Sequence, residues 1–385
     1  MTASELIRLI PASIFQDLAI ETKVDEQVKK LSGEVIFKLI LFSMLNSEKV
    51  SLRILETFLN SAQFKAFSRY DIIDGKYNSI HDRICAIKAE YFERLFQTIF
   101  SVYNNELKEQ NALSKADSTY IALATTLLQN GMRAGGGGEG NRYVKYSIAL
   151  TGSLPSAAKV FTTQPYVSED KALSEIINDS SNLEGNTVVF DRGLQCRASF
   201  DSFTGSRKFF VSRGNLNLRC KEYVGKDLPG NPPPDAPITI TSDGMGRLLS
   251  KRGKKTAYRY RIIRGISKSN GKELCFVTNI EDGSPYQIAE YYRQRWDIEV
   301  FFKFIKQHLN AKHLVSRNEN GIKVMLYMTM IVATLIIVYK KLNRISSMKI
   351  AKLRFELELE NSLVKEIVIL CGGNPAKAPH LFNSS

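Results

Sequence analysis

Four polar residues recur at helical spacing, Tyr292, Arg295, Glu299 and Lys306. We expect one helix from about Pro285 to Leu309, and at 100° per residue the four fall within an arc of about 60° on one of its faces. We call this arc the polar stripe. It sets a carboxylate, which is an oxygen ligand of the kind that hard divalent cations take, beside two cations that can hold phosphates. The fourth member is a phenol, which can donate a hydrogen bond.

The polar stripe adjoins an apolar face that can pack on a core, with Ile298, Phe301, Phe302, Ile305 and Leu309. The alternative is a solvated helix with ordinary pairs between Glu and a cation. The helix is rich in Phe and carries the only Trp of the chain, so we expect most of its circumference to be packed. A carboxylate on a packed helix needs a partner. We therefore interpret Trp296 as a core residue and Asp297, which lies off the stripe, as structural.

The whole chain is basic, with 53 Lys and Arg against 39 Asp and Glu among 385 residues. A surplus of this size is typical of proteins that bind nucleic acid. The five cysteines and four histidines show no zinc-ligand spacing, which favours reduced thiols in a cytosolic protein. The first residues lack a basic region followed by an apolar one, which argues against a secretory signal.

One segment, Val324–Tyr339, is apolar enough to be considered as a membrane span. It is shorter than the ~20 residues that a helix needs to cross a bilayer, and lysines bracket it. We interpret it as a buried core helix and expect no membrane partner.

Two aspartates upstream lie in or directly after short apolar runs. Asp117 lies in the run 115–123, and Asp191 follows the β-branched run Thr187–Phe190. We expect both runs to be strands, and α/β sheets place their chemistry at the carboxyl ends of strands. A lone Asp at such a place is more often a cap or a turn residue.

Between the two aspartates we expect further strands at 143–151 and 157–163 and a helix from Ser168 to Ile177. Four consecutive glycines at 135–138 could cradle a phosphate, but no Gly-Lys-Ser/Thr and no helix start follows them. We therefore reject a nucleotide-binding loop there and expect a turn.

The spacing of the polar stripe resembles the Tyr-Arg-Glu-Lys signature of one group of bacterial insertion-sequence transposases of the DDE type. The resemblance implies that Glu299 is the last of three metal-binding carboxylates. It also implies that Tyr292, Arg295 and Lys306 hold DNA phosphates near the cut. Helical geometry alone does not assign these roles.

The resemblance extends to the two aspartates. Asp117 matches the family's first carboxylate, and Asp191, within Val189-Phe190-Asp191-Arg192-Gly193, matches its second. It implies an α/β fold of the ribonuclease H type, with a five-stranded mixed sheet flanked by helices and Lys208–Ser212 as the fifth strand. An inserted β subdomain would interrupt this core, and an all-helical domain would precede it.

We expect five parts along the chain. They are an N-terminal helical domain that binds DNA ends (1–110), the first part of the catalytic core (111–213), a basic inserted β subdomain (214–282), the rest of the core (283–345) and a C-terminal helical region and tail (346–385). The insertion contains a loop at 230–234 and strand-like runs at 238–241, 256–263 and 274–278. In the family resembled, such an insertion contacts DNA and the hairpin formed during excision.

Three converging carboxylates repel one another unless cations neutralise them. Oxygen ligands with open positions suit Mg²⁺ or Mn²⁺, and two such ions can activate the attacking oxygen and stabilise the leaving oxygen of a phosphodiester. We therefore predict a DNA transposase that cleaves strands at transposon ends and joins them to target DNA by in-line phosphoryl transfer. Its expected partners are double-stranded terminal inverted repeats, target DNA and a second copy in a synaptic homodimer, at the nucleoid in the bacterial cytoplasm.

Two alternatives stay open. One is another DNA nuclease with a ribonuclease H-like core, such as a resolvase, which needs neither the basic insertion nor the polar stripe. The other is a transposase-derived DNA-binding protein without catalysis. The presence of Asp117, Asp191 and Glu299 argues against the second.

Overall fold

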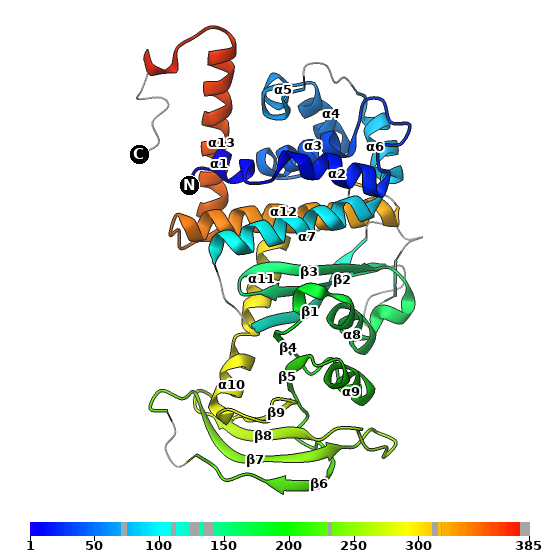
Figure 1. The fold of residues 1–385 in the computed structure, drawn as a ribbon, viewed down its shortest axis with the longest axis vertical. Coiled ribbons are helices and arrows are strands. Elements are labelled where there is room, and N and C mark those ends of the chain that lie inside the picture. Colours follow the sequence, from blue (N-terminus) through cyan, green and yellow to red (C-terminus); the bar gives the residue numbers. More distant parts are fainter. Residues whose placement is uncertain are drawn as a thin grey trace.

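A single nine-stranded sheet forms the centre of the computed structural model, with helices on both faces and a thick helical layer beyond one end (Figure 1). The structure describes residues 1–70, 75–108, 113–123, 131–133, 142–229, 233–309, 315–316 and 318–377. The predicted glycine turn at 135–138 lies outside the described residues, as does most of the predicted loop at 230–234. The strand order is β3-β2-β1-β4-β5-β9-β8-β7-β6.

The first five strands form a mixed sheet. Their bounds are β1 (Leu113–Ala122), β2 (Tyr143–Thr151), β3 (Leu154–Phe161), β4 (Thr187–Phe190) and β5 (Phe209–Arg213). β2 pairs antiparallel with both β1 and β3, whereas β4 pairs parallel with both β1 and β5. All five were predicted, and the bounds of β2 and β4 agree with the prediction.

The inserted segment extends this sheet. Its strands are β6 (Cys220–Gly225), β7 (Ile238–Leu248), β8 (Tyr260–Ser267) and β9 (Glu273–Thr278). β9 pairs antiparallel with β5, so the expectation of a sheet with only five strands is corrected to nine. The physical reason is the outer edge of β5, whose backbone groups would otherwise lack partners.

The described part of the first 107 residues contains seven helices, in the region where only helices were expected. They are α1 (Ala3–Arg8), α2 (Ala12–Thr22), α3 (Gly33–Asn46), α4 (Leu52–Leu59), α5 (Ala62–Ser68), α6 (Tyr77–Ala86) and α7 (Ala89–Leu107). Ser32, Ser51 and Ser61 begin α3, α4 and α5, and each side chain accepts a hydrogen bond from the backbone N–H three residues on.

The N-terminal helices share one core with the end of the chain. α12 (Glu319–Leu342) and α13 (Met348–Leu370) pack among them, and α7 and α12 also contact β3. By length and composition α12 could cross a membrane, but 94% of its most apolar window is buried inside the protein. Its burial agrees with the predicted core helix. Short 3-10 helices occur at Gln164–Val167, Ser181–Leu183 and Pro375–Lys377.

Helices cover both faces of the sheet. α8 (Glu169–Asp179) packs on β1, β2 and β3, and α9 (Arg197–Gly205) packs on β5. On the opposite face, α10 (Pro285–Arg293) contacts β4, β5 and β7, and α11 (Trp296–His308) contacts β1. The apolar residues predicted for α11, including Ile298, Phe301 and Ile305, are buried against the helical layer.

The expected single helix from Pro285 to Leu309 is wrong in one respect, because it is broken between α10 and α11. At the break the N–H groups of Arg295 and Asp297 each donate to the carbonyl oxygen three residues back. This is the tighter 3-10 pattern. The break lies within the polar stripe, so Tyr292 belongs to one helix and Glu299 to the next.

Candidate active site

Alternate residues of β1 face α11. Because side chains on one face of a strand recur every second residue, Lys115, Asp117 and Thr119 point to the same side. Each contacts a polar residue at the start of α11 or along it. The pairs are Lys115 with Asp297, Asp117 with Arg295, and Thr119 with Lys306. These three contacts hold the polar stripe over the strand that carries Asp117.

Arg295 bridges two of the predicted metal ligands. One guanidinium nitrogen lies 3.2 Å from Oδ2 of Asp117, and another donates to Oε1 of Glu299. The side chains of Arg295 and Asp117 are only 14% and 18% exposed, so this ion pair is shielded from water. Burial raises the pKa of Asp117 to about 7. Within this net pKa shift, the Ser118 N–H and Arg295 act against burial, whereas the carboxylates of Asp191 and Glu169 act with it.

Asp191 lies at the carboxyl end of β4, as predicted. β4 runs parallel to β1 with Lys115 opposite Val189, so Asp117 and Asp191 stand two residues further along neighbouring strands. Oδ1 of Asp191 accepts a hydrogen bond of 2.7 Å from the N–H of Gly193. The sheet thus brings together the first two predicted carboxylates.

The remaining members of the polar stripe stay with the site despite the helix break. Tyr292 is half-buried against Phe276, with ring centroids 5.3 Å apart, and its ring lies 5.9 Å from the guanidinium carbon of Arg295. Burial raises the pKa of Tyr292. Lys306 donates to Oγ1 of Thr119, which lies two residues along β1 from Asp117, on the same face of the strand.

The prediction that Trp296 belongs to the core is wrong. Its side chain is 61% exposed, and Val300, one turn further along α11, is 50% exposed. The apolar residues Ile298, Phe301 and Ile305 already occupy the faces that pack on the helical layer, which leaves Trp296 toward solvent. The site therefore has an exposed aromatic edge next to the polar stripe.

The donor set suits a hard divalent cation, because its predicted members are all carboxylates. Among the described residues, however, no group of three or more His, Cys, Asp or Glu is arranged to hold a metal ion. The guanidinium of Arg295 contacts one oxygen of Asp117 and one of Glu299. Two of the three predicted ligands are thus paired with the same arginine.

Sequence reasoning missed a buried ion pair beside the site. Lys145 of β2 has a fully buried side chain, and its Nζ lies 3.0 Å from Oε1 of Glu169 at the start of α8. Glu169 was expected only to begin a helix. A signal was present, because a lysine in the middle of the predicted strand 143–151 must find a partner if that strand is buried.

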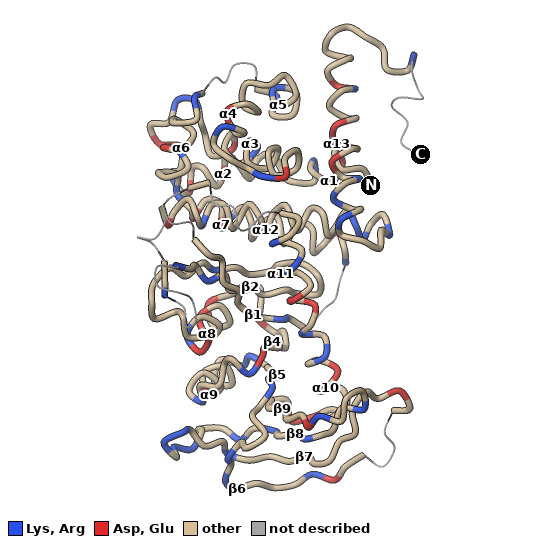
Figure 2. The backbone as a smooth tube through the Cα atoms, turned by 180° about the vertical axis from the view of Figure 1, so that it is seen from behind, with Lys and Arg blue, Asp and Glu red and all other residues tan. Residues whose placement is uncertain are grey.

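The inserted strands carry a basic turn between β7 and β8, visible as a concentration of Lys and Arg in Figure 2. Its exposed members are Lys251, Arg252, Lys254 and Lys255. Arg219 donates to the carbonyl oxygens of Ser250 and Lys251, at 3.2 and 3.1 Å. Backbone contacts therefore hold the turn in one shape.

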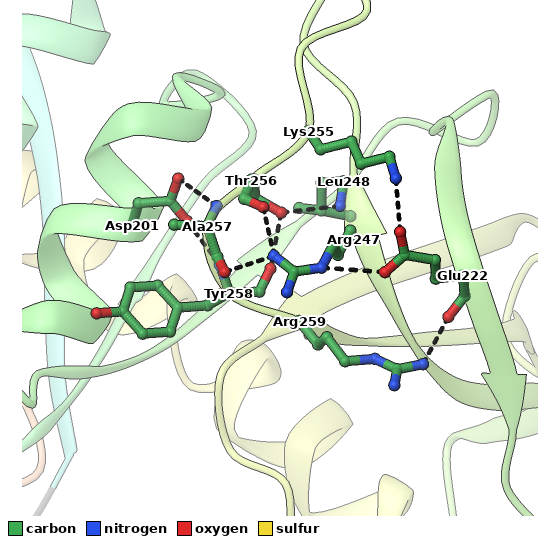
Figure 3. A network of polar contacts seen from close by, with 9 residues as sticks. All are labelled: Asp201, Glu222, Arg247, Leu248, Lys255, Thr256, Ala257, Tyr258 and Arg259. Carbon is green, nitrogen blue, oxygen red and sulfur yellow. Dashed lines mark hydrogen bonds and ion pairs between the residues drawn. The ribbon is translucent and has the colours of Figure 1, made fainter.

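A polar network fixes the base of this basic turn (Figure 3). Glu222 of β6 accepts from Nε of Arg247 at 3.0 Å and from Nζ of Lys255 at 2.6 Å. Arg247 also donates to the carbonyl oxygen of Thr256 at 2.9 Å. Asp201 of α9 accepts from the N–H of Ala257 at 2.9 Å, which ties the turn to the sheet's own helices.

Several proteins named as transposases resemble part of this chain. It is 47% identical over 260 residues to a Synechocystis protein named as a transposase for insertion sequence element IS4SA, covering 63% of this chain and 66% of that one. It is 25% identical over 270 residues to a Geobacillus stearothermophilus protein named as a transposase for element IS5377, covering 68% and 66%. A transposase-named protein of Sinorhizobium fredii is 28% identical over 162 residues, covering 42% and 45%. The chain thus spans between 45% and 66% of the lengths of these relatives.

Among solved structures, a piggyBac transposase synaptic complex with hairpin DNA matches with a TM-score of 0.49 at 8% identity, covering 99% of this chain and 84% of that one. A family model described as a transposase DDE domain matches residues 116–335. That match includes Asp117, Asp191 and Glu299 and covers more than half of the chain, which therefore belongs to the family of DDE transposase domains.

Proposed function

We propose that this chain is a DNA transposase that cleaves strands at the ends of an insertion sequence and transfers them to target DNA. The observation that carries the proposal is the meeting of Asp117 and Glu299 at Arg295, with Asp191 at the end of the adjacent strand. Family membership supports the same activity. The bacterial relatives named for insertion sequence elements support an element of that kind, acting on DNA inside a bacterial cell.

Asp117, Asp191 and Glu299 would hold Mg²⁺ or Mn²⁺, and we propose two ions. Bound there, divalent ions would supply Lewis acidity to the attacking and leaving oxygens of a phosphodiester. For Asp117 and Glu299 to serve as ligands, their oxygens must be released from Arg295. The freed guanidinium could then hold a DNA phosphate, together with Lys306 and Tyr292.

The finer family assignment is also part of the proposal. We propose the group with the Tyr-Arg-Glu-Lys signature, because Tyr292, Arg295 and Lys306 stay around Glu299 across the helix break. We further propose a ribonuclease H-like core. The strand arrangement supports a core of this type, because three antiparallel strands are followed by two parallel ones. Asp117 lies on the first of these strands and Asp191 directly after the fourth.

The proposed parts of the chain are the five predicted from sequence, at 1–110, 111–213, 214–282, 283–345 and 346–385. DNA would contact the basic turn of the insertion, where exposed lysines and an arginine are held in one shape. The N-terminal helices would take part in binding DNA ends.

We propose a homodimer in the synaptic complex, with α13 as the contact. Exposed apolar residues of α13 recur at steps of three, four and seven residues, namely Ile350, Leu353, Leu357 and Val364. This is the spacing of a coiled-coil seam. The opposite side of the helix, with Phe355 and Leu359, is buried within the chain. Leu353→Asp should reduce dimers with end DNA in sedimentation experiments.

The test is cleavage of a duplex carrying the element's own ends, in Mg²⁺ or Mn²⁺ against EDTA. Wild type should release a 3′-hydroxyl end only with metal. Asp191→Ala and Glu299→Gln should lower the rate roughly a thousandfold or more, because several kcal/mol of transition-state stabilisation are lost. Both variants should still bind the ends. Tight binding without cleavage in any metal would instead identify a DNA-binding protein without catalysis.

A further inference from the structure

The loop after Asp191 rests on the start of α8. A Cβ built at Gly193 would lie 2.8 Å from Oδ1 of Asp191 and 3.0 Å from Cγ of Glu169. A larger residue at position 193 would therefore press against the side chains of Asp191 and Glu169. The next acidic residue, Asp170, accepts from the N–H groups of Gln195 and Cys196, at 2.6 and 2.7 Å. The first turn of α8 thus holds the segment that leaves β4.

A buried lysine in turn holds Glu169. Nζ of Lys145 donates to Oε1 of Glu169 at 3.0 Å and to the carbonyl oxygen of Val167 at 2.7 Å, and it lies 4.9 Å from the ring centroid of Tyr120. Tyr120 donates to the same carbonyl at 2.9 Å. These contacts join β1, β2 and the start of α8, three residues along β1 from Asp117. Breaking such a buried pair leaves an uncompensated charge, so its members are fixed in place.

The second carboxylate oxygen of Glu169, Oε2, lies outside these contacts. Oε2 is buried and has no hydrogen-bond partner among the described residues. A buried carboxylate oxygen without a partner is unfavourable unless another group satisfies it. The charge of Glu169 also acts on Asp117, in the same direction as that of Asp191. Glu169 is thus a fourth carboxylate beside the two strand aspartates, oriented by its own lysine.

We propose that Glu169, held by Lys145, is a positioning residue for the cation site of Asp117 and Asp191. It would fix the Asp191 turn through Gly193 and add negative charge outside the direct ligands, with Oε2 free to accept a hydrogen bond from a water on the cation. This inference rests on the proposed function, because it takes Asp117 and Asp191 as ligands.

The test measures Mn²⁺ binding by the full chain without DNA, from the loss of the electron paramagnetic resonance signal of free Mn²⁺. Glu169→Gln should weaken binding about 10- to 100-fold, the range found when outer-shell partners are removed. The matched control is Glu175→Gln. Glu175 lies on the same helix and pairs with a strand lysine, Lys159, at 3.2 Å, but it is not among the groups that shift the pKa of Asp117. The Glu175→Gln protein should bind Mn²⁺ as wild type does.

Asp191→Asn separates the two ways in which the idea can fail. If Asp191→Asn loses Mn²⁺ while Glu169→Gln binds it normally, the inference about Glu169 is overturned and the proposed site stands. If Asp191→Asn also binds normally, the proposed site itself fails. A general folding defect would show as a lower melting temperature in EDTA. In that case Glu169→Gln combined with Lys145→Met, which buries neither charge alone, should fold and still show the Mn²⁺ defect; normal binding by the double variant would refute the proposal.

Discussion

Arg295 and Asp117 form an ion pair at 3.2 Å between a helix and the strand that carries the first candidate ligand. Because Arg295 also donates to Glu299, one guanidinium compensates two carboxylates that a cation would otherwise share. A bound cation would therefore compete with Arg295 for Oδ2 of Asp117 and Oε1 of Glu299. We propose that Arg295 pairs with these carboxylates in the absence of a cation and holds a DNA phosphate once a cation is bound.

Arg295→Ala should make the protein more dependent on a divalent cation. Without the guanidinium, Asp117 and Glu299 repel each other, so the melting temperature in EDTA should fall below that of wild type. Mn²⁺ should then raise the melting temperature of Arg295→Ala more than it raises that of wild type.

The control for this prediction is Arg293→Ala. Arg293 is 65% exposed and forms an ion pair with Glu290, three residues away on the same helix. Its loss should leave the response to Mn²⁺ unchanged. Equal Mn²⁺ shifts in all three proteins would contradict competition between Arg295 and a cation.

Asp117 should make stability in EDTA fall as the pH rises toward neutrality. Burial raises its pKa from 3.8 to about 7, so between these values the folded protein holds a proton that the unfolded chain releases. The stabilising effect is complete below about pH 4 and is lost as the pH passes 7. Thermal melting of wild type and Asp117→Asn from pH 5 to 8 checks this. Relative to the variant, wild type should lose several degrees over that range, and parallel profiles would refute the assignment.

The sequence predicted the strands and their aspartates better than it predicted the surroundings of Glu299. β2 and β4 have the predicted bounds because each is a continuous buried run between turn residues. The places of Asp117 within β1 and of Asp191 directly after β4 followed from the predicted strands. β6, in contrast, is an exposed edge strand with charged residues and no apolar run to mark it.

Angles around an ideal helix correctly grouped the polar stripe but could not show which neighbours each face meets. The break at Arg295 and the exposure of Trp296 depend on contacts with β1 and with the helical layer. Such contacts join residues that are far apart in the sequence: Arg295 and Asp117 are separated by more than a hundred residues. For Lys145, the strand pattern can suggest that a partner is needed, but it cannot assign that partner as Glu169.

Trp296 should report DNA binding directly. It is the only Trp of the chain, is 61% exposed, and lies one turn from Glu299. If duplex DNA lies against the polar stripe, adding end DNA in EDTA should produce a saturable change in tryptophan fluorescence. Trp296→Phe should bind the same DNA in a gel-shift assay without the optical signal. If wild type binds tightly with no change in fluorescence, the DNA does not lie against this face.

The last prediction concerns the junction between the inserted strands and α10. Arg261 of β8 and Asp243 of β7 are 3% and 2% exposed and lie 2.6 Å apart. Arg261 also donates to the carbonyl oxygens of Glu281, Asp282 and Gly283, at 3.3, 3.1 and 3.0 Å. These residues immediately precede α10, so one arginine ties the insertion to the helix that leads into the site.

Asp243→Asn should destabilise the protein by about 3–5 kcal/mol, because it leaves the buried charge of Arg261 without its counter-ion. Urea unfolding measures the loss, and Glu222→Gln in the same strands is the control. Glu222 pairs with Arg247 and Lys255 at the surface, where water replaces lost partners, so its variant should unfold almost as wild type does. If both variants unfold alike, the buried pair is not what joins the insertion to α10. If Asp243→Asn is less stable and also cleaves end DNA more slowly at a temperature where it remains folded, the junction positions the Glu299 helix as well as stabilising the sheet.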